Sequence, residues 1–265
     1  MHEILRSLPP ESLVLDLGSA EGSFPQTATS ATVVRLDQVS PNNRVGRTLF
    51  VQGDAALLPF PDQTFAAVIS NHSLEHFDDL VTVLREIRRV ISSNGCPFVA
   101  VPDASTLTDK LYRWLASGGG HVNAFVSADE TAAVIERVTG LPHVATRALC
   151  SSLSFLNRRN APRPLPRRLL LLGSGYEWSL FLYAWLSRRL DRLVNTHTSI
   201  YGWGFYFGNV VEAIDIETWV NVCIRCGAGS PSGNLIKQGL VRSSFLALRI
   251  YRCPHCGATN PFADD

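Results

Sequence analysis

The chain has 265 residues, of which 46% are hydrophobic and 18% charged, and its formal net charge is +1. This length is sufficient for one large domain, or for a medium and a small domain, with a well-buried core. The balanced charge provides no overall electrostatic attraction to nucleic acid or to a membrane surface.

Short apolar runs alternate with amphipathic segments through the first half of the chain, a pattern typical of βαβ units and a parallel sheet. The predicted strands are 13–17, 32–36, 48–52, 65–70, 97–101, 144–149 and 199–207. Residues 78–91 carry apolar side chains three and four positions apart, which predicts a helix that Asn94 and Gly95 end. A second helix is expected over 127–139, before Gly140.

A glycine-rich turn follows the first predicted strand in the segment LVLDLGSAEGSF, residues 13–24. Glycine allows a tight turn and the close approach of a ligand, and the next helix offers unpaired N–H groups. A plain turn or a dinucleotide-binding turn would have the same pattern. Asp37 ends the second strand, where a carboxylate can accept the hydroxyls of a ribose, and Asp54 follows the third strand, where an acid can read an adenine edge.

The run PDQTFAAVISNHSLEHFDD then adds the fourth strand and the start of a helix. Residues 13–102 as a whole resemble the class I S-adenosylmethionine (SAM) dependent methyltransferases, in particular the type 11-like group with its ordered pattern GDA–LPFPD–F–V–S–LEH. The resemblance implies a Rossmann-like, doubly wound α/β fold with a seven-stranded sheet. It also implies SAM as the cofactor and a methyltransferase activity.

The resemblance further implies which residues bind SAM. They are Asp16, Gly18, Ser19, Ala20 and Gly22 around the methionine portion, Asp37 and Gln38 at the ribose, Asp54 and Ala55 at the adenine, and Asn71 and Ser73 near the sulfonium. The chain departs from the family at Ala20, where many members have a glycine.

Methyl transfer from a sulfonium is an in-line displacement in which the cofactor carries the reactivity and the protein orients the acceptor. A general base is needed only if the acceptor must lose a proton. His121, which follows three glycines, and His76, in the LEH motif, are the candidate catalytic residues. The alternative for His76 is a structural role at the start of a helix, and His72 is expected to pack on the cofactor side.

Four of the six cysteines form two CxxCG motifs, Cys223–Cys226 and Cys253–Cys256. Two such turns can place four thiolates around one tetrahedral Zn²⁺, which leaves no open position for a substrate. We therefore predict a structural zinc ribbon, with two disulfides or idle thiols as the alternatives. This cysteine usage and the absence of a signal-peptide pattern indicate a cytoplasmic protein.

Residues 151–200 contain eight arginines and two acidic residues, a local net charge of +6, around a segment rich in Leu, Phe, Tyr and Trp. One interpretation is a peripheral membrane contact through 165–192, or a cap over the acceptor. The alternative, which we favour, is a helical pair packed on its own domain or in a dimer, with solvated arginines. The expected domains are 1–212, with 151–198 as a basic, apolar helical insertion, and the zinc ribbon 213–265.

Three functions remain open from the sequence. The favoured one is methylation of an O, N or C atom of a small-molecule or lipid-linked acceptor. The second is methylation of RNA or protein with the ribbon as the reader, and the third is a non-catalytic scaffold that keeps the fold. The sequence NHSL after the fourth strand, in place of an NPPY-like tetrapeptide, weakens the second, and the intact acidic residues weaken the third.

Overall fold

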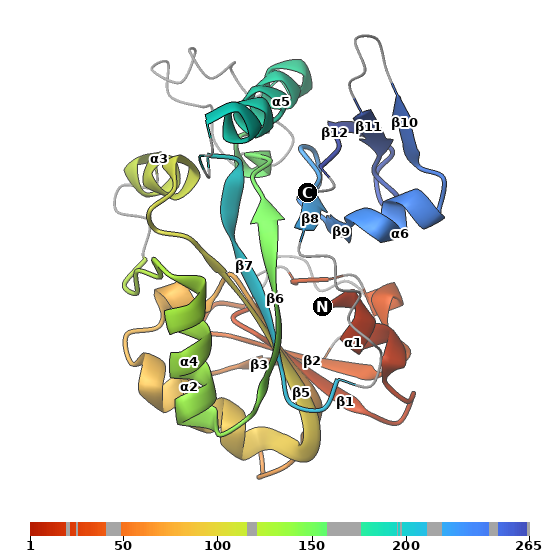
Figure 1. Ribbon diagram of the computed structural model, residues 1–265. Helices are drawn as coiled ribbons and strands as arrows, with labels where there is room; N and C mark the ends of the chain where they lie inside the picture. The colour runs from red at the N-terminus through yellow and green to blue at the C-terminus, as the bar shows by residue number, and fades with distance from the viewer. Residues whose placement is uncertain are drawn as a thin grey trace. The chain divides into compact units, whose positions relative to one another are not determined.

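The computed structural model describes residues 1–19, 22–24, 26–40, 49–115, 121–157, 176–194, 196, 198–210, 219–243 and 249–263. Figure 1 shows helices on both sides of a central sheet. The helices are α1 (His2–Ser7), η1 (Gln26–Ala28), η2 (Leu74–His76), α2 (Leu80–Val90), α3 (Leu107–Leu115), α4 (Ala128–Thr139), η3 (Ser154–Leu156), α5 (Glu177–Val194) and α6 (Ser232–Lys237). The strands are β1 (Leu13–Leu17), β2 (Thr32–Asp37), β3 (Leu49–Gln52), β4 (Phe65–Asn71), β5 (Ile91–Pro102), β6 (His143–Cys150), β7 (Ile200–Phe207), β8 (Trp219–Val222), β9 (Gly229–Pro231), β10 (Val241–Ser243), β11 (Arg249–Arg252) and β12 (Thr259–Pro261).

The main sheet has the strand order β3-β2-β1-β4-β5-β7-β6-β8-β9. Strands β1 to β5 pair in parallel, and the order changes direction between β1 and β4, where Leu17 lies opposite Ser70. Ligands of doubly wound sheets bind outside the carboxyl ends of the strands at such a switch point. The topology therefore places the expected cofactor site at the ends of β1, β2 and β4.

The seven predicted strands are all present, and the expected Rossmann-like, doubly wound α/β fold class is confirmed. Two further strands, β8 and β9, extend the sheet; β8 pairs in parallel with β6 at Ala148 and Leu149, and β9 pairs antiparallel with β8. They are short and lie in the cysteine-bearing part of the chain, so their sequence has no long alternating pattern to reveal them.

The caps of the two predicted helices follow from their sequences. The side chain of Asp79 accepts a hydrogen bond from the Thr82 N–H and caps α2, and Ser127 caps α4 in the same way. Gly140 ends α4 in the left-handed region with φ +66°. The expectation that Asn94 and Gly95 end α2 is wrong: α2 ends at Val90 and β5 starts at once, because its first residues pair with β4 across an irregular register.

By its internal contacts the chain forms two compact units. The first comprises 1–104, 113–146 and 203–214, and the second 105–112, 147–202 and 215–265. The expected boundary at residue 212 stays a prediction. The expected insertion 151–198 belongs, where it is described, to the same unit as the cysteine motifs, and its residues 158–175, including the Pro-rich entry, lie outside the described residues.

In the first unit, α2 and α4 lie side by side on one face of the sheet and α1 lies on the other (Figure 1). Leu84 and Ile87 of α2 and Ile135 of α4 pack on the apolar side chains of β1, β4, β5 and β7 in one core cluster. Close packing in this core holds the strands, and therefore their carboxyl ends, in fixed positions.

In the second unit, α5 packs on β12 through a face that contains Leu180 and Ala184. Arg188 is also buried, and its guanidinium donates to the Asn221 side chain and to the Pro261 carbonyl. The expectation that the arginines of this segment are solvated is therefore wrong for Arg188. A buried guanidinium is stable because carbonyl oxygens accept its hydrogen bonds.

Among the described residues, no helix combines the length and the hydrophobicity that crossing a membrane requires.

Candidate functional site

The turn after β1 has the conformation that its glycine predicts. Gly18 has φ +64°, and the N–H groups of Gly18 and Ser19 both donate to the Leu36 carbonyl, at 2.9 and 3.2 Å. A Cβ atom on Gly18 would lie 2.5 Å from the Cβ of Ser73. Only glycine therefore allows the end of β1 to approach the segment after β4 this closely.

Asp16 braces this turn from inside. Its carboxylate is fully buried, accepts a hydrogen bond from the Ser23 N–H at 3.0 Å and lies 3.6 Å from Nε of Arg35. Arg35 in turn donates to the Phe24 carbonyl at 3.0 Å. Burial raises the pKa of Asp16 to about 6, although the hydrogen bonds from Ser23 and the charge of Arg35 act in the opposite direction. The contacts of Asp16 thus fix the shape of the loop.

Two carboxylates lie at the ends of the neighbouring strands. Asp37, at the end of β2, accepts from the Val39 N–H at 3.0 Å and is half-buried, while Gln38 beside it is exposed. Asp54, two residues after β3, is exposed and accepts from the Ala56 N–H at 2.9 Å. Each carboxylate is held by a local turn and stays accessible to a ligand.

The segment after β4 forms the third side of the site. Asn71 is half-buried, and His72 has φ +56°, a conformation that a non-glycine residue adopts at a cost. The hydroxyl of Ser73 is buried, donates to the Leu17 carbonyl at 2.9 Å and lies 2.7 Å from the Ser70 hydroxyl. Ser73 therefore joins the ends of β1 and β4.

Most of the predicted cofactor residues thus lie on one edge of the sheet. Ala55 is buried beside the exposed Asp54, Ser19 is buried within the loop, and Gly22 has φ +115°. Ala20 lies outside the described residues.

His76 and His121 lie together next to this edge. Their ring centroids are 4.8 Å apart in an edge-to-face arrangement. Glu75, which the sequence pairs with His76 only as a structural feature at the start of a helix, completes the group. One ligand atom each of Glu75, His76 and His121 lies within 4.8 Å of the other two. The LEH motif was the only signal for Glu75 in the sequence, and nothing in the sequence places it beside His121.

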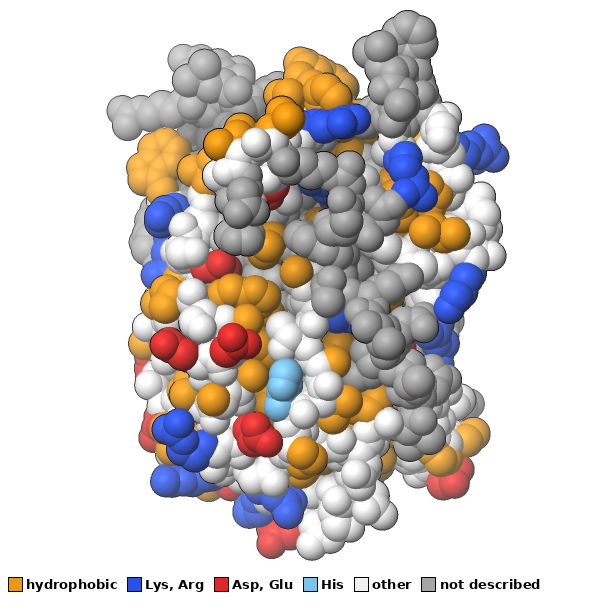
Figure 2. Space-filling model, viewed as in Figure 1, with side chains coloured by type: hydrophobic (Ala, Val, Ile, Leu, Met, Phe, Trp, Pro, Cys, Tyr) orange, Lys and Arg blue, Asp and Glu red, His pale blue; other side chains and the backbone are white. Residues whose placement is uncertain are grey.

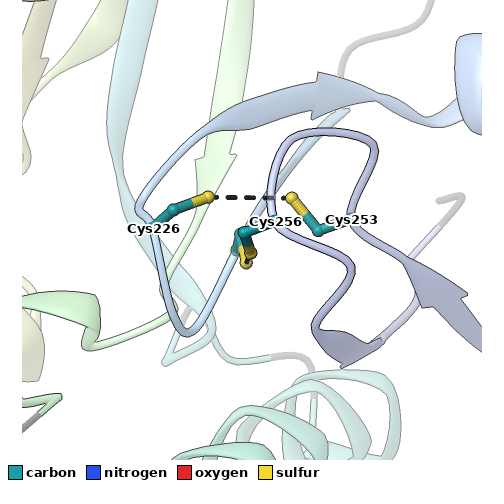
Figure 3. Close-up of side chains that lie close together, drawn as sticks. Cys226, Cys253 and Cys256 are labelled. Carbon is teal, nitrogen blue, oxygen red and sulfur yellow. Dashed lines mark hydrogen bonds between the residues drawn. The ribbon is translucent and has the colours of Figure 1, made fainter. Parts of the chain in front are cut away.

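The four cysteines of the CxxCG motifs also come together. The Sγ atoms of Cys226 and Cys253 are 3.7 Å apart (Figure 3). Those of Cys223 and Cys256 are 3.6 Å apart. A tetrahedral site with metal–sulfur bonds of about 2.3 Å has edges of about 3.8 Å, whereas a disulfide has sulfurs about 2 Å apart. The cluster therefore has the dimensions of a Cys₄ metal site, and all four cysteines are free thiols.

Both cysteine motifs have the same turn. Gly227 donates to the Cys223 carbonyl at 3.0 Å with φ +72°, and Gly257 donates to the Cys253 carbonyl at 2.9 Å with φ +70°. Glycine after each motif allows this left-handed turn, which aims two sulfurs at one point. The motif spacing predicted this arrangement.

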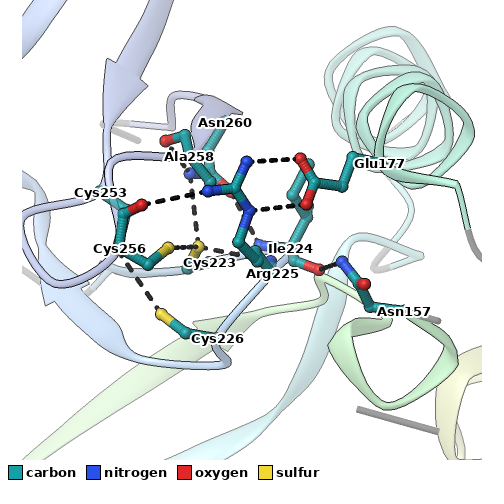
Figure 4. Close-up of polar contacts among 10 residues, drawn as sticks. All are labelled: Asn157, Glu177, Cys223, Ile224, Arg225, Cys226, Cys253, Cys256, Ala258 and Asn260. Atoms are coloured by element: carbon teal, nitrogen blue, oxygen red, sulfur yellow. Dashed lines mark hydrogen bonds and ion pairs between the residues drawn. The ribbon is translucent and has the colours of Figure 1, made fainter. Parts of the chain in front are cut away.

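Arg225, between the first two cysteines, ties the cluster to α5. It forms a two-pronged ion pair with Glu177, at 2.6 and 2.7 Å, and donates to the Cys256 carbonyl at 3.1 Å (Figure 4). Asn260 and the Arg225 N–H each donate to Sγ of Cys223, at 3.6 and 3.4 Å. Such N–H contacts stabilise the thiolate form that binds metal.

Comparison with known proteins agrees with this geometry. Residues 15–99 match the family described as methyltransferase domain. The chain is 32% identical over 112 residues to a demethylmenaquinone methyltransferase of Roseiflexus castenholzii, which covers 37% of this chain and 47% of that protein. It is 28% identical over 184 residues to a malonyl-[acyl-carrier protein] O-methyltransferase of Halorhodospira halophila, with 62% of this chain and 60% of the relative covered.

The chain thus spans about half the length of these curated relatives. Among solved structures, it is similar to a SAM-dependent methyltransferase from Archaeoglobus fulgidus with a TM-score of 0.50 and 16% identity over 74% of this chain and 86% of that one. At this identity the similarity supports the shared fold.

Proposed function

We propose that this protein transfers the methyl group of SAM to an O, N or C atom of a small-molecule or lipid-linked acceptor. The observation that carries the proposal is the closed turn after β1, in which Gly18 contacts Ser73 and Asp16 holds Ser23 and Arg35, beside two accessible carboxylates. At this topological switch point of the sheet, the glycine lets a ligand approach the backbone closely. The two carboxylates can accept hydrogen bonds from the ligand's hydroxyl groups.

The residues at this edge of the sheet fit the parts of SAM. Asp37 would hold the ribose hydroxyls with Gln38 beside it, Asp54 and Ala55 would contact the adenine, and Asn71 would lie near the sulfonium. Gly18 and the loop that follows would surround the methionine portion. SAM supplies the activated methyl group, and the protein positions the acceptor against it.

The proposed acceptor class is supported by the relatives, which are named for demethylmenaquinone and for malonyl-[acyl-carrier protein]. His76 lies in the segment after β4 and His121 packs against its ring, and an imidazole in this position could take the proton of an acceptor hydroxyl or amine. We propose them as the groups that face the acceptor.

The Cys₄ cluster is proposed to bind one structural Zn²⁺. Its edge lengths support a tetrahedral ion, and four thiolates leave no position for a substrate. The metal would stabilise the small segment of β10, β11 and β12, whose own core cluster is small.

A peripheral membrane contact of α5 is part of the proposal. One face of α5 exposes Trp178, Leu182, Leu186, Leu190 and Leu193, four or three residues apart. Figure 2 shows hydrophobic side chains gathered at the upper end of the view, where Figure 1 places α5. An exposed apolar stripe with neighbouring arginines is typical of helices that lie on an anionic lipid surface, which is where a lipid-linked acceptor is found.

Calorimetric titration of the zinc-loaded protein with SAM and with S-adenosylhomocysteine tests the cofactor assignment. We expect micromolar binding of both, and a loss of at least about tenfold in affinity for Asp37→Ala, because the ribose hydroxyls lose their acceptor. Asp78→Ala, which removes an exposed carboxylate after η2, is the matched control and should bind as the wild type. A folded wild type that binds neither compound would refute the proposed function.

A further inference from the structure

The cluster of Glu75, His76 and His121 has a feature that the proposed proton transfer does not require. It brings two imidazoles and one carboxylate together from segments 45 residues apart, with one ligand atom of each within 4.8 Å of the others. Glu75 is 1% exposed, whereas His121 is half-buried and His76 is exposed. The cluster thus has a buried carboxylate at its base and two imidazoles toward solvent.

The backbone fixes this arrangement. The N–H groups of Val122 and Asn123 donate to the Glu75 carbonyl, at 2.7 and 3.0 Å. The side-chain amide of Asn123 donates to the carbonyls of Leu74 and Phe77, at 3.0 and 2.7 Å. Four hydrogen bonds therefore fasten the residues next to His121 onto η2, so its approach to His76 results from specific pairing and is preorganised.

The ligand chemistry selects a class of ion. Two imidazoles and a carboxylate are a common ligand set for first-row divalent metals such as Zn²⁺ and Fe²⁺, and three protein ligands leave positions open. Bond lengths of about 2.0 to 2.2 Å require ligand atoms roughly 3 to 3.5 Å apart. Small rotations of the two imidazole rings would bring the ligand atoms to this separation from the observed limit of 4.8 Å.

The geometry points to a second metal site in this protein, a divalent transition-metal site formed by Glu75, His76 and His121 and open to an exogenous ligand. It differs from the Cys₄ cluster in ligand type and in having free coordination positions. If the chain acts as the proposed methyltransferase, an acceptor oxygen would occupy an open position beside the end of β4, and His76 and His121 would act as metal ligands in place of the proton transfer proposed for them. That role rests on the proposed function, but metal binding itself does not.

The test counts metal ions. Protein that carries one zinc on its cysteines is dialysed against metal-free buffer and titrated with Zn²⁺ by calorimetry, and the bound metal is measured by mass spectrometry. We expect one further equivalent in the wild type. His121→Asn and His76→Asn should weaken this second equivalent at least about tenfold, because each removes one of three ligands, and should keep the first.

The control is His143→Asn, which changes an exposed histidine of β6 whose ring contacts Thr146 and the aromatic side chains of β7. It should bind two equivalents like the wild type. Glu75→Gln is a further variant, but it alters a buried group. The variants of the exposed His76 and the half-buried His121 therefore decide whether the site exists. A wild type with one zinc only, or a second equivalent that persists in His121→Asn and His76→Asn, would overturn the site. Neither result depends on whether SAM binds.

Discussion

The buried carboxylate of Asp16 makes the stability of this protein depend on pH in a direction opposite to that of most acidic groups. Its pKa is about 6 in the folded chain against 3.8 for an ordinary aspartate, and the main cause is burial. A group with a raised pKa binds its proton more tightly when folded, so its contribution to stability is present below the unfolded pKa and is lost as the pH rises through 6. That difference corresponds to about 3 kcal/mol at a pH above both values.

Asp16→Asn isolates this effect, because asparagine keeps the size of the side chain and an oxygen that can accept from Ser23. We compare the free energy of unfolding of the variant with that of the wild type at about pH 4.5 and at about pH 7.5. The difference should shift in favour of the variant by about 2 kcal/mol, which is the share of the roughly 3 kcal/mol effect that develops between these two pH values. The ion pair with Arg35 forms only where Asp16 is ionised, and the charge of Arg35 already contributes to the pKa of about 6, so it needs no separate correction.

The assay is urea unfolding of the zinc-loaded, SAM-free proteins at the two pH values, followed by the midpoint and slope of the transition. Other titrating groups are common to both proteins and cancel in the difference, including those that release zinc at low pH. Asp78→Asn, at an exposed position, is the control and should show no such change. A difference between Asp16→Asn and wild type that stays constant with pH would show that Asp16 ionises in its ordinary range, and the reasoning from burial would be wrong.

The other predictions concern the loop, the cysteines and α5. Gly18→Ala should lower the free energy of unfolding by about 1 to 2 kcal/mol, because alanine is strained at a φ of +64°. It should also weaken SAM binding in calorimetry, because the new Cβ pushes the loop away from Ser73. An unchanged SAM affinity would contradict the close approach of Gly18 to Ser73. Cys226→Ser should lower the zinc content from one per chain and the melting temperature, while Cys96→Ser, in the first unit, keeps the zinc; metal analysis decides. The double variant Trp178→Glu, Leu186→Glu should reduce cosedimentation with phosphatidylglycerol-containing vesicles at least about tenfold. Leu57→Glu, which changes another exposed apolar residue, should not reduce it. Equal binding of the wild type, the double variant and Leu57→Glu would exclude α5 as the membrane contact.

The sequence predicted the parts of the fold that depend on short local patterns, such as an apolar run, a cap residue or a pair of cysteines. β1 has its predicted bounds because an apolar run ends at a glycine, and α4 begins and ends at a serine and a glycine that cap it. The Cys₄ cluster follows in the same way, since spacing and a following glycine determine each turn. The bounds of α2 and β5 were less predictable, because the pairing of β5 with β4 competes with the helix signal and starts the strand at Ile91.

The parts that the sequence did not predict depend on contacts between distant residues. His121 meets His76 because Asn123 and the backbone N–H groups beside it bond to η2, and no local pattern encodes a side-chain amide that bridges Leu74 and Phe77. For the same reason the sequence marked both histidines but gave Glu75 no part in the site.

The adjacent arginines of α5 show why the inward face of such a helix cannot be read from its own sequence. Arg188 is buried and donates to Asn221 and Pro261, whereas Arg189 is exposed and lies 5.8 Å from the ring of Trp185. One residue turns a helix by about 100°, so two neighbours of the same type can have opposite environments. Both faces of α5 are rich in apolar residues, and hydrophobicity therefore does not choose between them. At Arg188, the side-chain oxygen of Asn221 in β8 and the carbonyl of Pro261 in β12 accept hydrogen bonds from the buried guanidinium. In this orientation of α5 the apolar stripe beginning at Trp178 is exposed to solvent.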